Sequence, residues 1–463
     1  MLSEIGLIGL GVMGKNIALN IAEKGTFVKA FNGSRSKIDL VGKEFDGMFA
    51  GFTDLEDLVN NLERPRNILL MIPSGQPTHS VINQLSKLLD EGDVIIDGGN
   101  SFYKESLNYG NILSSQAVNF IGMGVSGGEE GARQGPAIMV GSDNNLNDEL
   151  VELLSAISAK APNDCVGFYR GYGSGHFIKM VHNGIEYAEM QLISEIYHLL
   201  KHAEYSNVKI AEFFESLKKI NQSSYLIEIT SEILRKKDGD FFTLDLIKPF
   251  ANNKGTGKLT VETSFELGIS APSIYAAYDA RVQSNAGDAW KGGSNQIEDT
   301  ISKLNPSFKK IINESNLSKA LYFGRLAAMF QGLKIINKYS EIYDLSVNFS
   351  DVFKNWSGGC IIRSQMLDEM LEINKTSDDF LKSESIHNLL KDRLNVVKDV
   401  VSNSILNNIS LPVLSSSLSW YLNLSADSNP SNLIQAQRDY FGSHNVQLLD
   451  SDEYIHIDWR SNE

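Results

Sequence analysis

The segment Ile5-Gly6-Leu7-Ile8-Gly9-Leu10-Gly11-Val12-Met13-Gly14 joins an apolar run to three glycines with G-x-G-x-x-G spacing. The apolar run Ile5–Leu10 predicts a buried strand, and the amphipathic stretch Met13–Glu23 predicts a helix directly after it. In this context the glycines allow a tight turn and a close approach of the backbone to a pyrophosphate, which the N–H groups of a helix N-terminus can bind. The alternative is a glycine-rich turn that binds nothing. We predict a dinucleotide site formed by Gly9, Leu10, Gly11, Val12, Met13 and Gly14.

The first 172 residues continue this alternation of strands and helices. Further apolar runs that predict buried parallel strands are Phe27–Phe31, Ile68–Ile72, Val94–Asp97 and Ala137–Val140. We therefore expect a doubly wound, Rossmann-like α/β domain in residues 1–172. Helical periodicity dominates afterwards, for example in His176–His202 and Leu317–Tyr339, which predicts a large all-α domain in residues 173–430. Residues 431–463 are polar and are expected to form an extended C-terminal tail.

Composition narrows the class of protein. A chain of 463 residues with 42% hydrophobic residues can bury a large core, and no apolar run is long enough to span a membrane. The N-terminus does not resemble a secretory signal, and there are only two cysteines, so we expect a cytoplasmic protein. The formal net charge of −15 disfavours nucleic acid and membranes as partners. No Cys/His cluster has metal-ligand spacing, so we predict no metal site.

The end of the second predicted strand bears on the choice between NAD and NADP. An enzyme that uses NAD tends to place Asp or Glu there for the ribose 2′-hydroxyl. This chain instead places two cations and two hydroxyl groups there, which suit a 2′-phosphate, in the run Asn32, Gly33, Ser34, Arg35, Ser36 and Lys37. We therefore predict that NADP is the cofactor, with NAD still possible. The alternative to binding is a solvated turn.

A polar stripe interrupts the apolar pattern of the helix predicted at His176–His202. Five residues are spaced so that they share one helical face: Lys179, His182, Asn183, Glu186 and Tyr187. A solvated helix face is the usual reason for such a stripe. However, this helix is too apolar to lie fully on the surface, and a base, an acid, an amide and a phenol are groups that proton-transfer chemistry uses. The stripe is therefore the candidate catalytic face.

Two glycine-rich turns follow predicted strands. The turn Ser126-Gly127-Gly128 can form a nest of backbone N–H groups that binds an anion. The turn Asp97-Gly98-Gly99-Asn100-Ser101 lies at a strand end, where open α/β sheets bind their ligands. Either segment could be a tight turn only. The segment Gly171–Gly175, before the predicted catalytic helix, is expected to be a flexible linker.

Together these motifs resemble the 6-phosphogluconate dehydrogenase family, and the resemblance runs over essentially the whole chain. The most specific matching stretches are Ser126–Arg133, Gly175–Tyr187, Asn253–Lys258, Gly358–Ser364 and Gln435–Gly442. The resemblance implies that 6-phospho-D-gluconate is oxidised and decarboxylated to D-ribulose 5-phosphate and carbon dioxide in the pentose phosphate pathway, with reduction of NADP and without a metal.

The resemblance also implies roles for the residues of the catalytic stripe. Lys179 would take the proton of the C3 hydroxyl and later act as an acid, and Glu186 would protonate C1 of the enediol that decarboxylation leaves. A base at Lys179 must be neutral, so its surroundings should lower its pKa. His182 and Asn183 would orient the substrate.

The remaining implied contacts involve both substrate and cofactor. The substrate carboxylate and hydroxyls would be held by Asn100, Ser126, Gly127 and Gly128. Its 6-phosphate would be bound by Tyr187, Lys254 and Arg281, together with Arg438 and His444 of the partner subunit, which implies a homodimer with composite sites. The cofactor site would also include Met71, Ile72 and Asn100.

Three departures from the family pattern lie in the predicted cofactor domain. Gly33 and Ser34 stand where the family has Arg and Thr, Ile72-Pro73-Ser74-Gly75 lacks a family lysine, and Gln134 stands where an aromatic residue is common. Two alternatives therefore stay open. One is another β-hydroxyacid dehydrogenase, which the phosphate-binding residues disfavour. The other is a pseudoenzyme that binds nucleotide or sugar phosphate, which the presence of both Lys179 and Glu186 disfavours.

Overall fold

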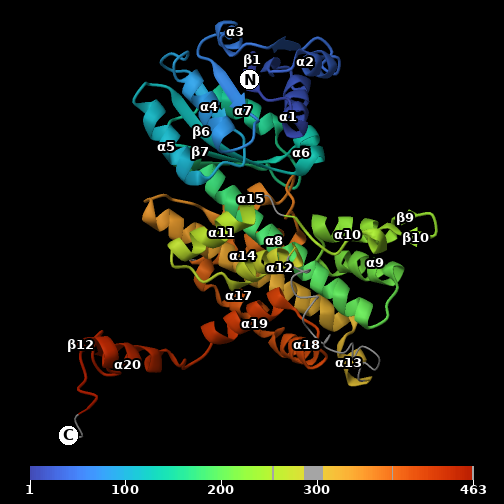
Figure 1. Ribbon diagram of the computed structural model, residues 1–463, viewed down its shortest axis with the longest axis vertical. Helices are drawn as coiled ribbons and strands as arrows, with labels where there is room; N and C mark the ends of the chain where they lie inside the picture. The colour runs from blue at the N-terminus through green and yellow to red at the C-terminus, as the bar shows by residue number, and fades with distance from the viewer. Residues whose placement is uncertain (253–254, 286–305, 378, 461–463) are drawn as a thin grey trace. The chain divides into compact units, whose positions relative to one another are not determined.

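The computed structural model describes residues 1–252, 255–285, 306–377 and 379–460 (Figure 1). The predicted phosphate ligand Lys254 lies outside the described residues. The chain divides into two compact units, Met1–Ser417 and Leu418–Glu463, and each is described by itself. None of the described helices is long and apolar enough to cross a membrane.

An eight-stranded sheet organises the first part of the chain, in the order β3-β2-β1-β4-β5-β6-β7-β8. The strands are β1 (Glu4–Ile8), β2 (Phe27–Phe31), β3 (Phe49–Phe52), β4 (Asn67–Leu70), β5 (Val94–Asp97), β6 (Asn119–Ser126), β7 (Ala137–Ser142) and β8 (Val166–Arg170). Strands β1 to β6 are parallel, whereas β7 and β8 run in the opposite direction. The predicted parallel direction of Ala137–Val140 is therefore wrong. The connection 127–136 is shorter than the dozen or so residues that a parallel crossover needs.

Helices cover both faces of the sheet. Apolar side chains of α1, α2 and α7 pack against one face, and those of α3, α4 and α5 pack against the other. The helices are α1 (Val12–Glu23), α2 (Arg35–Gly42), α3 (Leu55–Asn60), α4 (Gln76–Leu85), α5 (Tyr103–Ser114), α6 (Gly128–Gln134) and α7 (Asp148–Ile157). This arrangement confirms the predicted doubly wound α/β fold, and the carboxyl ends of β1 to β6 meet along one edge of the sheet.

The helical part begins with α8 (Ser174–His202), which packs beside α11, α12 and α14 and also runs along β6 and β7 (Figure 1). The later helices are α9 (Asn207–Ser216), α10 (Tyr225–Arg235), α11 (Thr256–Glu266), α12 (Pro272–Asn285), α13 (Pro306–Ile311), α14 (Glu314–Ile342), α15 (Phe349–Trp356), α16 (Gln365–Thr376), α17 (Glu384–Lys391), α18 (Leu394–Leu406) and α19 (Pro412–Leu424). A small hairpin, β9 (Lys237–Asp238) and β10 (Phe241–Phe242), follows α10. The predicted helical second half is confirmed.

The segment Gly171–Gly175 is not the flexible linker that the sequence predicted. All five residues are buried, and α8 already begins at Ser174. A Cβ added to Gly175 would lie only 2.2 Å from the carbonyl oxygen of Gly122. The glycines therefore serve close packing of the start of α8 against the sheet, and not mobility.

The C-terminal unit contains a helix that the sequence reading did not include. Helix α20 (Ser431–Gly442) is followed by the short antiparallel strands β11 (Val446–Gln447) and β12 (Tyr454–Ile455). The buried carboxylate of Asp439 ties the chain after α20 back onto this helix. It accepts hydrogen bonds from Asn445 N, His456 Nδ1, Ile457 N and Trp459 Nε1. The domain boundaries at residues 172 and 430 stay predictions.

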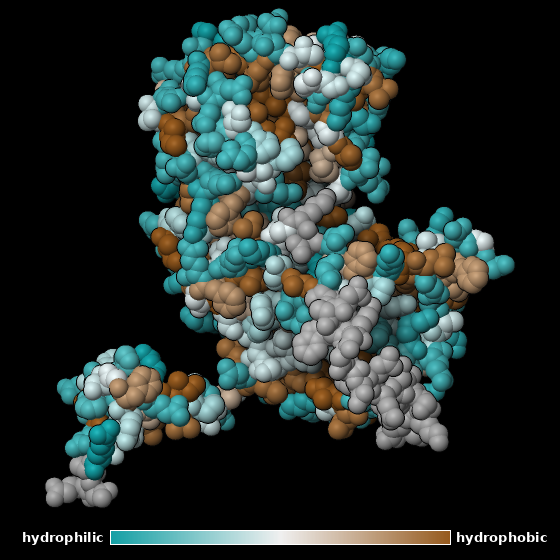
Figure 2. Space-filling model, viewed as in Figure 1, coloured by the Kyte–Doolittle hydropathy of each residue, from teal (hydrophilic) through white to brown (hydrophobic). Residues whose placement is uncertain are grey.

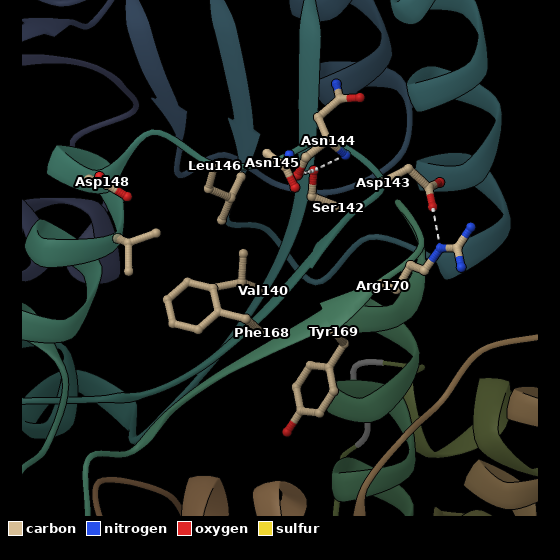
Figure 3. A pocket seen from close by; sticks show the side chains of 11 residues that line it. Val140, Ser142, Asp143, Asn144, Asn145, Leu146, Asp148, Phe168, Tyr169 and Arg170 are labelled. Carbon is tan, nitrogen blue, oxygen red and sulfur yellow. Dashed lines mark hydrogen bonds and ion pairs between the residues drawn. The ribbon is translucent and has the colours of Figure 1, made fainter.

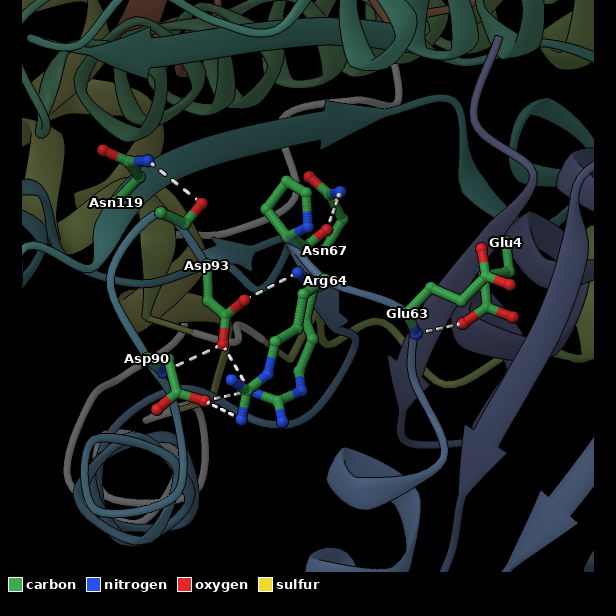
Figure 4. A network of polar contacts seen from close by, with 10 residues as sticks. Glu4, Glu63, Arg64, Asn67, Asp90, Asp93 and Asn119 are labelled. Atoms are coloured by element: carbon green, nitrogen blue, oxygen red, sulfur yellow. Dashed lines mark hydrogen bonds and ion pairs between the residues drawn. The ribbon is translucent and has the colours of Figure 1, made fainter.

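A buried charged network lies at the edge of the sheet where β4 and β5 begin (Figure 4). Arg66 and Asp93 are 5% and 1% exposed, and Nη1 of Arg66 lies 2.7 Å from Oδ2 of Asp93. The same carboxylate accepts hydrogen bonds from the backbone N–H groups of Arg66 and Asp90 at 2.7 and 2.9 Å. The network therefore joins the loops that precede two neighbouring strands.

Asp93→Asn is expected to lower the free energy of unfolding by about 3 kcal/mol, because the Arg66 guanidinium loses its buried countercharge and keeps only the half-exposed carboxylate of Asp90, 2.9 Å away. Urea titration of the variant and of the unchanged protein measures the difference. A loss below about 1 kcal/mol, as for exposed ion pairs, would contradict this account. The network lies at the edge opposite the glycine-rich turns, so substrate KM should not change.

Candidate active site

Helix α8 approaches strand β6 closely because β6 has glycine at alternate positions. Gly122 and Gly124 face α8, and a Cβ added to Gly124 would lie 2.4 Å from the Cβ of Lys179. Further along the same face of β6, Oγ of Ser126 lies 3.1 Å from Nε2 of His182. The sequence reading missed these two glycines. Their spacing at i and i+2 in a strand was the available signal, since it marks a face that another element approaches closely.

Three titratable side chains of the polar stripe lie in contact. Nζ of Lys179 is 3.3 Å from Nδ1 of His182. Nδ1 of His182 is in turn 3.7 Å from Oε2 of Glu186. Lys179, His182, Asn183 and Tyr187 are buried, and the side chain of Glu186 is 20% exposed. The alternative of a solvated helix face is therefore wrong.

Burial shifts the pKa values in this cluster toward the neutral forms. The pKa of Lys179 is lowered by burial, against the opposing charge of Glu186. The pKa of Glu186 is raised by burial, although the charges of Lys179 and Arg281 oppose the shift. Burial and the charge of Lys179 hold the pKa of His182 well below its ordinary value. The cluster can thus supply a base and an acid side by side.

The turn that ends β6 opens beside this cluster. Gly127 has a φ of +135°, and a Cβ there would lie 2.4 Å from the carbonyl oxygen of Gly359. Gly128 has a φ of +64°, and nothing lies within 4 Å of where its Cβ would be. Both conformations favour glycine. Gly128 is exposed, so the backbone of the turn is open to solvent there, whereas the neighbouring Ser126 is buried against His182.

Tyr187 and Arg281 lie together next to Glu186 on α8. The Arg281 guanidinium carbon is 3.7 Å from the centroid of the Tyr187 ring. A Cβ added to Gly257, at the start of α11, would lie 2.5 Å from the same ring. Three helices thus converge on a cation and a phenol, which are suitable ligands for a phosphate.

Asn100 is exposed and borders a small hollow beside the catalytic stripe. The hollow is lined by Asn100, Ser101, His176, Lys179, Met180, Asn183, Thr256 and Leu259. The structure therefore brings the turn after β5 together with α8 and α11. Arg438 and His444 belong to the C-terminal unit, where both are exposed, and their place at the site stays a prediction.

The glycine-rich turn after β1 has the form that a pyrophosphate site requires. Gly9 has a φ of +101°, and its Cβ would lie 2.6 Å from the carbonyl oxygen of Met71 and 2.7 Å from Cγ2 of Ile72. A Cβ at Gly14 would lie 2.0 Å from the carbonyl oxygen of Gly9, whereas the space around Gly11 is open. The first turn of α1 carries no acidic side chain. The turn and helix N-terminus fit a dinucleotide.

The end of β2 fits a 2′-phosphate. Ser34 caps α2, and its Oγ lies 3.0 Å from Oγ of Ser36. The first turn of α2 has no acidic residue. Arg35 pairs with Asp39 at 3.1 Å, but their side chains are 68% and 58% exposed, so this pair is weak and Arg35 can turn to a ligand. The hydroxyls and cations of this turn therefore favour the 2′-phosphate of NADP over the free 2′-hydroxyl of NAD.

A second hollow, of about 730 Å³, lies at the carboxyl ends of β7 and β8 (Figure 3). Because these strands run opposite to β6, it lies at the other edge of the sheet from the turn after β1. Asp143 and Asp148 line it, with Arg170 3.9 Å from Asp143 as the counterion. No predicted site residue lines this hollow. Among the described residues, no group of three His, Cys, Asp or Glu side chains could hold a metal.

Comparison with known proteins covers nearly the whole chain. The profile for the NAD binding domain of 6-phosphogluconate dehydrogenase matches residues 4–171, and the profile for its C-terminal domain matches residues 175–459. The decarboxylating 6-phosphogluconate dehydrogenase of Lactococcus lactis subsp. lactis is 38% identical, with 99% of this chain and 98% of the relative covered. That of Staphylococcus aureus strain N315 is also 38% identical, with 99% of both covered.

A solved structure agrees with these relatives. Plasmodium falciparum 6-phosphogluconate dehydrogenase, studied in its apo form and in complexes with NADP+ and with 6-phosphogluconate, matches with a TM-score of 0.89 and 35% identity. The match covers 98% of this chain and 100% of that chain. The chain therefore belongs to the 6-phosphogluconate dehydrogenase family.

Proposed function

We propose that the chain catalyses the NADP-dependent oxidative decarboxylation of 6-phosphogluconate to ribulose 5-phosphate and carbon dioxide. The observation that carries the proposal is the buried contact of Lys179, His182 and Glu186 on α8, beside the Ser126 turn. The lowered pKa of Lys179 favours the neutral amine, which can accept a proton, and the raised pKa of Glu186 favours the protonated acid, which can donate one. The two free, buried cysteines, Cys165 and Cys360, support a cytoplasmic location.

In the first step Lys179, as the neutral amine, takes the proton of the C3 hydroxyl. The turns after β1 and β2 would hold NADP, whose role when bound is to accept the hydride that leaves C3. His182 orients Lys179, because its Nδ1 contacts Nζ and its Nε2 contacts Ser126. The products of this step are a 3-keto acid and a protonated Lys179.

In the second step the protonated Lys179 polarises the C3 carbonyl. The bond between C1 and C2 breaks, C1 leaves as carbon dioxide, and the electron pair moves to the C3 oxygen, which takes the proton of Lys179 and gives an enediol. Glu186, whose pKa is raised by burial, then donates its proton to the carbon that lost the carboxylate. Lys179 takes back the proton of the enediol oxygen as the ketone product forms. No metal is required to polarise the ketone, because Lys179 already supplies a cation.

The direct test mixes the purified protein with 6-phosphogluconate and either NADP+ or NAD+ in buffer that contains a chelator. We expect reduction of NADP+ at the higher kcat/KM. Faster reduction of NAD+ would keep the reaction but contradict the cofactor assignment. No reduction with either cofactor, from folded protein that still binds 6-phosphogluconate, would favour the pseudoenzyme.

The pH profile should have two limbs. We expect kcat/KM to fall at low pH as Lys179 becomes protonated, and to fall at high pH as Glu186 loses its proton. Glu186→Gln should lower kcat and remove the alkaline limb while the acidic limb stays. An unchanged alkaline limb in this variant would show that another group is responsible for it.

Gly33→Arg should strengthen NADP binding. Nothing lies within 4 Å of where the Cβ of residue 33 would be, and Gly33 does not need a left-handed backbone. The new guanidinium can pair with the 2′-phosphate, and we expect KM for NADP+ to fall about tenfold, as for one charge-assisted hydrogen bond. KM for NAD+ should change much less. Equal changes for both cofactors would show that the arginine does not contact the 2′-phosphate.

We further propose that the chain acts as a homodimer in which Arg438 and His444 of the partner subunit complete the phosphate site. The C-terminal unit presents apolar side chains to solvent, and Figure 2 shows them interspersed with hydrophilic residues. Leu433 and Phe441 on α20 are 62% and 74% exposed, and they line an open hollow with Ala436, Gln437, Tyr440 and Trp459. Such a small unit gains stability by docking on a second chain.

Mixing two inactive variants tests the composite site. Lys179→Met and Arg438→Ala each impair all sites of their own homodimers. After subunit exchange, a mixed dimer has one site that combines an intact Lys179 with an intact Arg438 from the other subunit. Activity should therefore reappear on mixing. No recovery, although mixed dimers are present, would contradict a shared site.

A further inference from the structure

The turn that carries Asn100 is stabilised by hydrogen bonds between its own residues, and these bonds do not connect it to α8. The buried carboxylate of Asp97 accepts a hydrogen bond from Oγ of Ser101 at 2.6 Å and from the N–H of Gly99 at 3.0 Å. These bonds shape the turn from within. They do not set its distance from Lys179, which lies on a different element across the same hollow.

His176 belongs to the first turn of α8, and its side chain lines the hollow that Asn100 borders. Its side chain is buried, and its Nδ1 lies 2.6 Å from Oγ of Ser106, a buried residue of α5. A Cβ added to Gly122 would lie 3.0 Å from the same ring nitrogen, so β6 leaves room for the imidazole. The ring therefore contacts α5 on one side and lines the hollow that Asn100 and Lys179 share.

The other ring nitrogen, Nε2, is buried and makes no hydrogen bond to any described residue. Burial lowers the pKa of His176, against the charge of Asp97 and the carbonyl groups of Gly99 and Asp97, so the ring is neutral and carries one proton. When the Ser106 hydroxyl donates to Nδ1, the single ring proton is on Nε2. The ring then presents an N–H donor near the carbonyl groups of Gly99 and Asp97. A buried donor without a partner is costly unless a partner reaches it in some state of the protein.

We propose that His176 is a positioning residue, whose Nε2–H holds the Gly99–Asn100 segment at its working distance from Lys179 when substrate binds. The inference rests on the proposed function, because it takes Asn100 to bind the substrate of that reaction. His176 precedes Lys179 by three residues on the same helical face, so the anchor and the base move as one body. The alternative is a core histidine that only fills space between α5 and β6.

Two substitutions separate these roles. In His176→Gln the amide nitrogen can occupy the place of Nε2 and still donate to the turn. In His176→Asn the shorter side chain reaches Ser106 but not the turn. We expect His176→Asn to lose roughly 10- to 100-fold in kcat/KM for 6-phosphogluconate, as for a misplaced substrate contact. His176→Gln should recover most of this loss, and both should unfold at similar urea concentrations.

Two controls keep the outcome interpretable. Asp93→Asn, at the opposite edge of the sheet, should lower stability without changing kcat/KM. Ser106→Ala should reproduce part of the His176→Asn defect, because the ring is then free to place its proton on Nδ1. Equal losses in His176→Asn and His176→Gln, or no loss in either, would overturn the proposal. An inactive unchanged protein would instead contradict the proposed function, which makes the two failures distinguishable.

Discussion

Lys179→Met is expected to lower kcat about 10⁴-fold, the upper range for loss of general acid–base catalysis. The expectation is this large because one amine serves both steps, first as the base at the C3 hydroxyl and then as the cation beside the ketone. Methionine is apolar and of similar length, so it can occupy the buried position without the cost of a buried charge. Steady-state kinetics with 6-phosphogluconate and NADP+ measure the loss.

The comparison variant is Lys338→Met on α14, where the lysine is 39% exposed and pairs with Glu341 on the surface. It should retain the kcat of the unchanged protein. Lys179→Met should still bind 6-phosphogluconate and should unfold at the same or a higher urea concentration. A variant at Lys179 that keeps more than a tenth of the activity would show that another group acts as the base.

Gly124→Ala should lower kcat/KM by roughly 100-fold through geometry alone, since a shift of about 1 Å in a catalytic group has an effect of this size. The added Cβ would lie 2.4 Å from the Cβ of Lys179, so α8 must move away from β6 or the strand must bend. We also expect a loss of about 1–3 kcal/mol in unfolding free energy, as for other overpacked cores.

Met123→Ala is the matched control on the same strand. Met123 is fully buried in the apolar cluster on the opposite face of β6. Its truncation should lower the unfolding free energy by about 2–5 kcal/mol and leave kcat/KM nearly unchanged. If Gly124→Ala loses stability but keeps its kcat/KM, the close contact between α8 and β6 does not position Lys179.

Local sequence patterns were sufficient to predict the strands and helices whose apolar residues follow a clear period. The run Phe27–Phe31 and the run Val94–Asp97 coincide with β2 and β5. The helix predicted at His176–His202 is α8, which begins two residues earlier. The grouping of Lys179, His182 and Glu186 also followed from helical spacing, because residues three and four apart share a face.

The features that were missed depend on contacts between distant segments. The reversed direction of β7 is set by its short connection and its pairing with β6, which an apolar run does not reveal. Gly171–Gly175 looked mobile because glycine is permissive, but its neighbours in space make it a packed turn. The role inferred for His176 depends on Ser106, 70 residues earlier in the chain, and therefore was not visible in local spacing.

The most direct test of the proposed reaction uses 6-phosphogluconate labelled with carbon-13 at C1. With NADP+ and the unchanged protein, we predict labelled carbon dioxide and NADPH in equal amounts, together with unlabelled ribulose 5-phosphate. NADPH without labelled carbon dioxide would mean that the chain oxidises the substrate but does not decarboxylate it. Neither product, from folded protein, would contradict the assignment of Lys179 and Glu186 to this reaction.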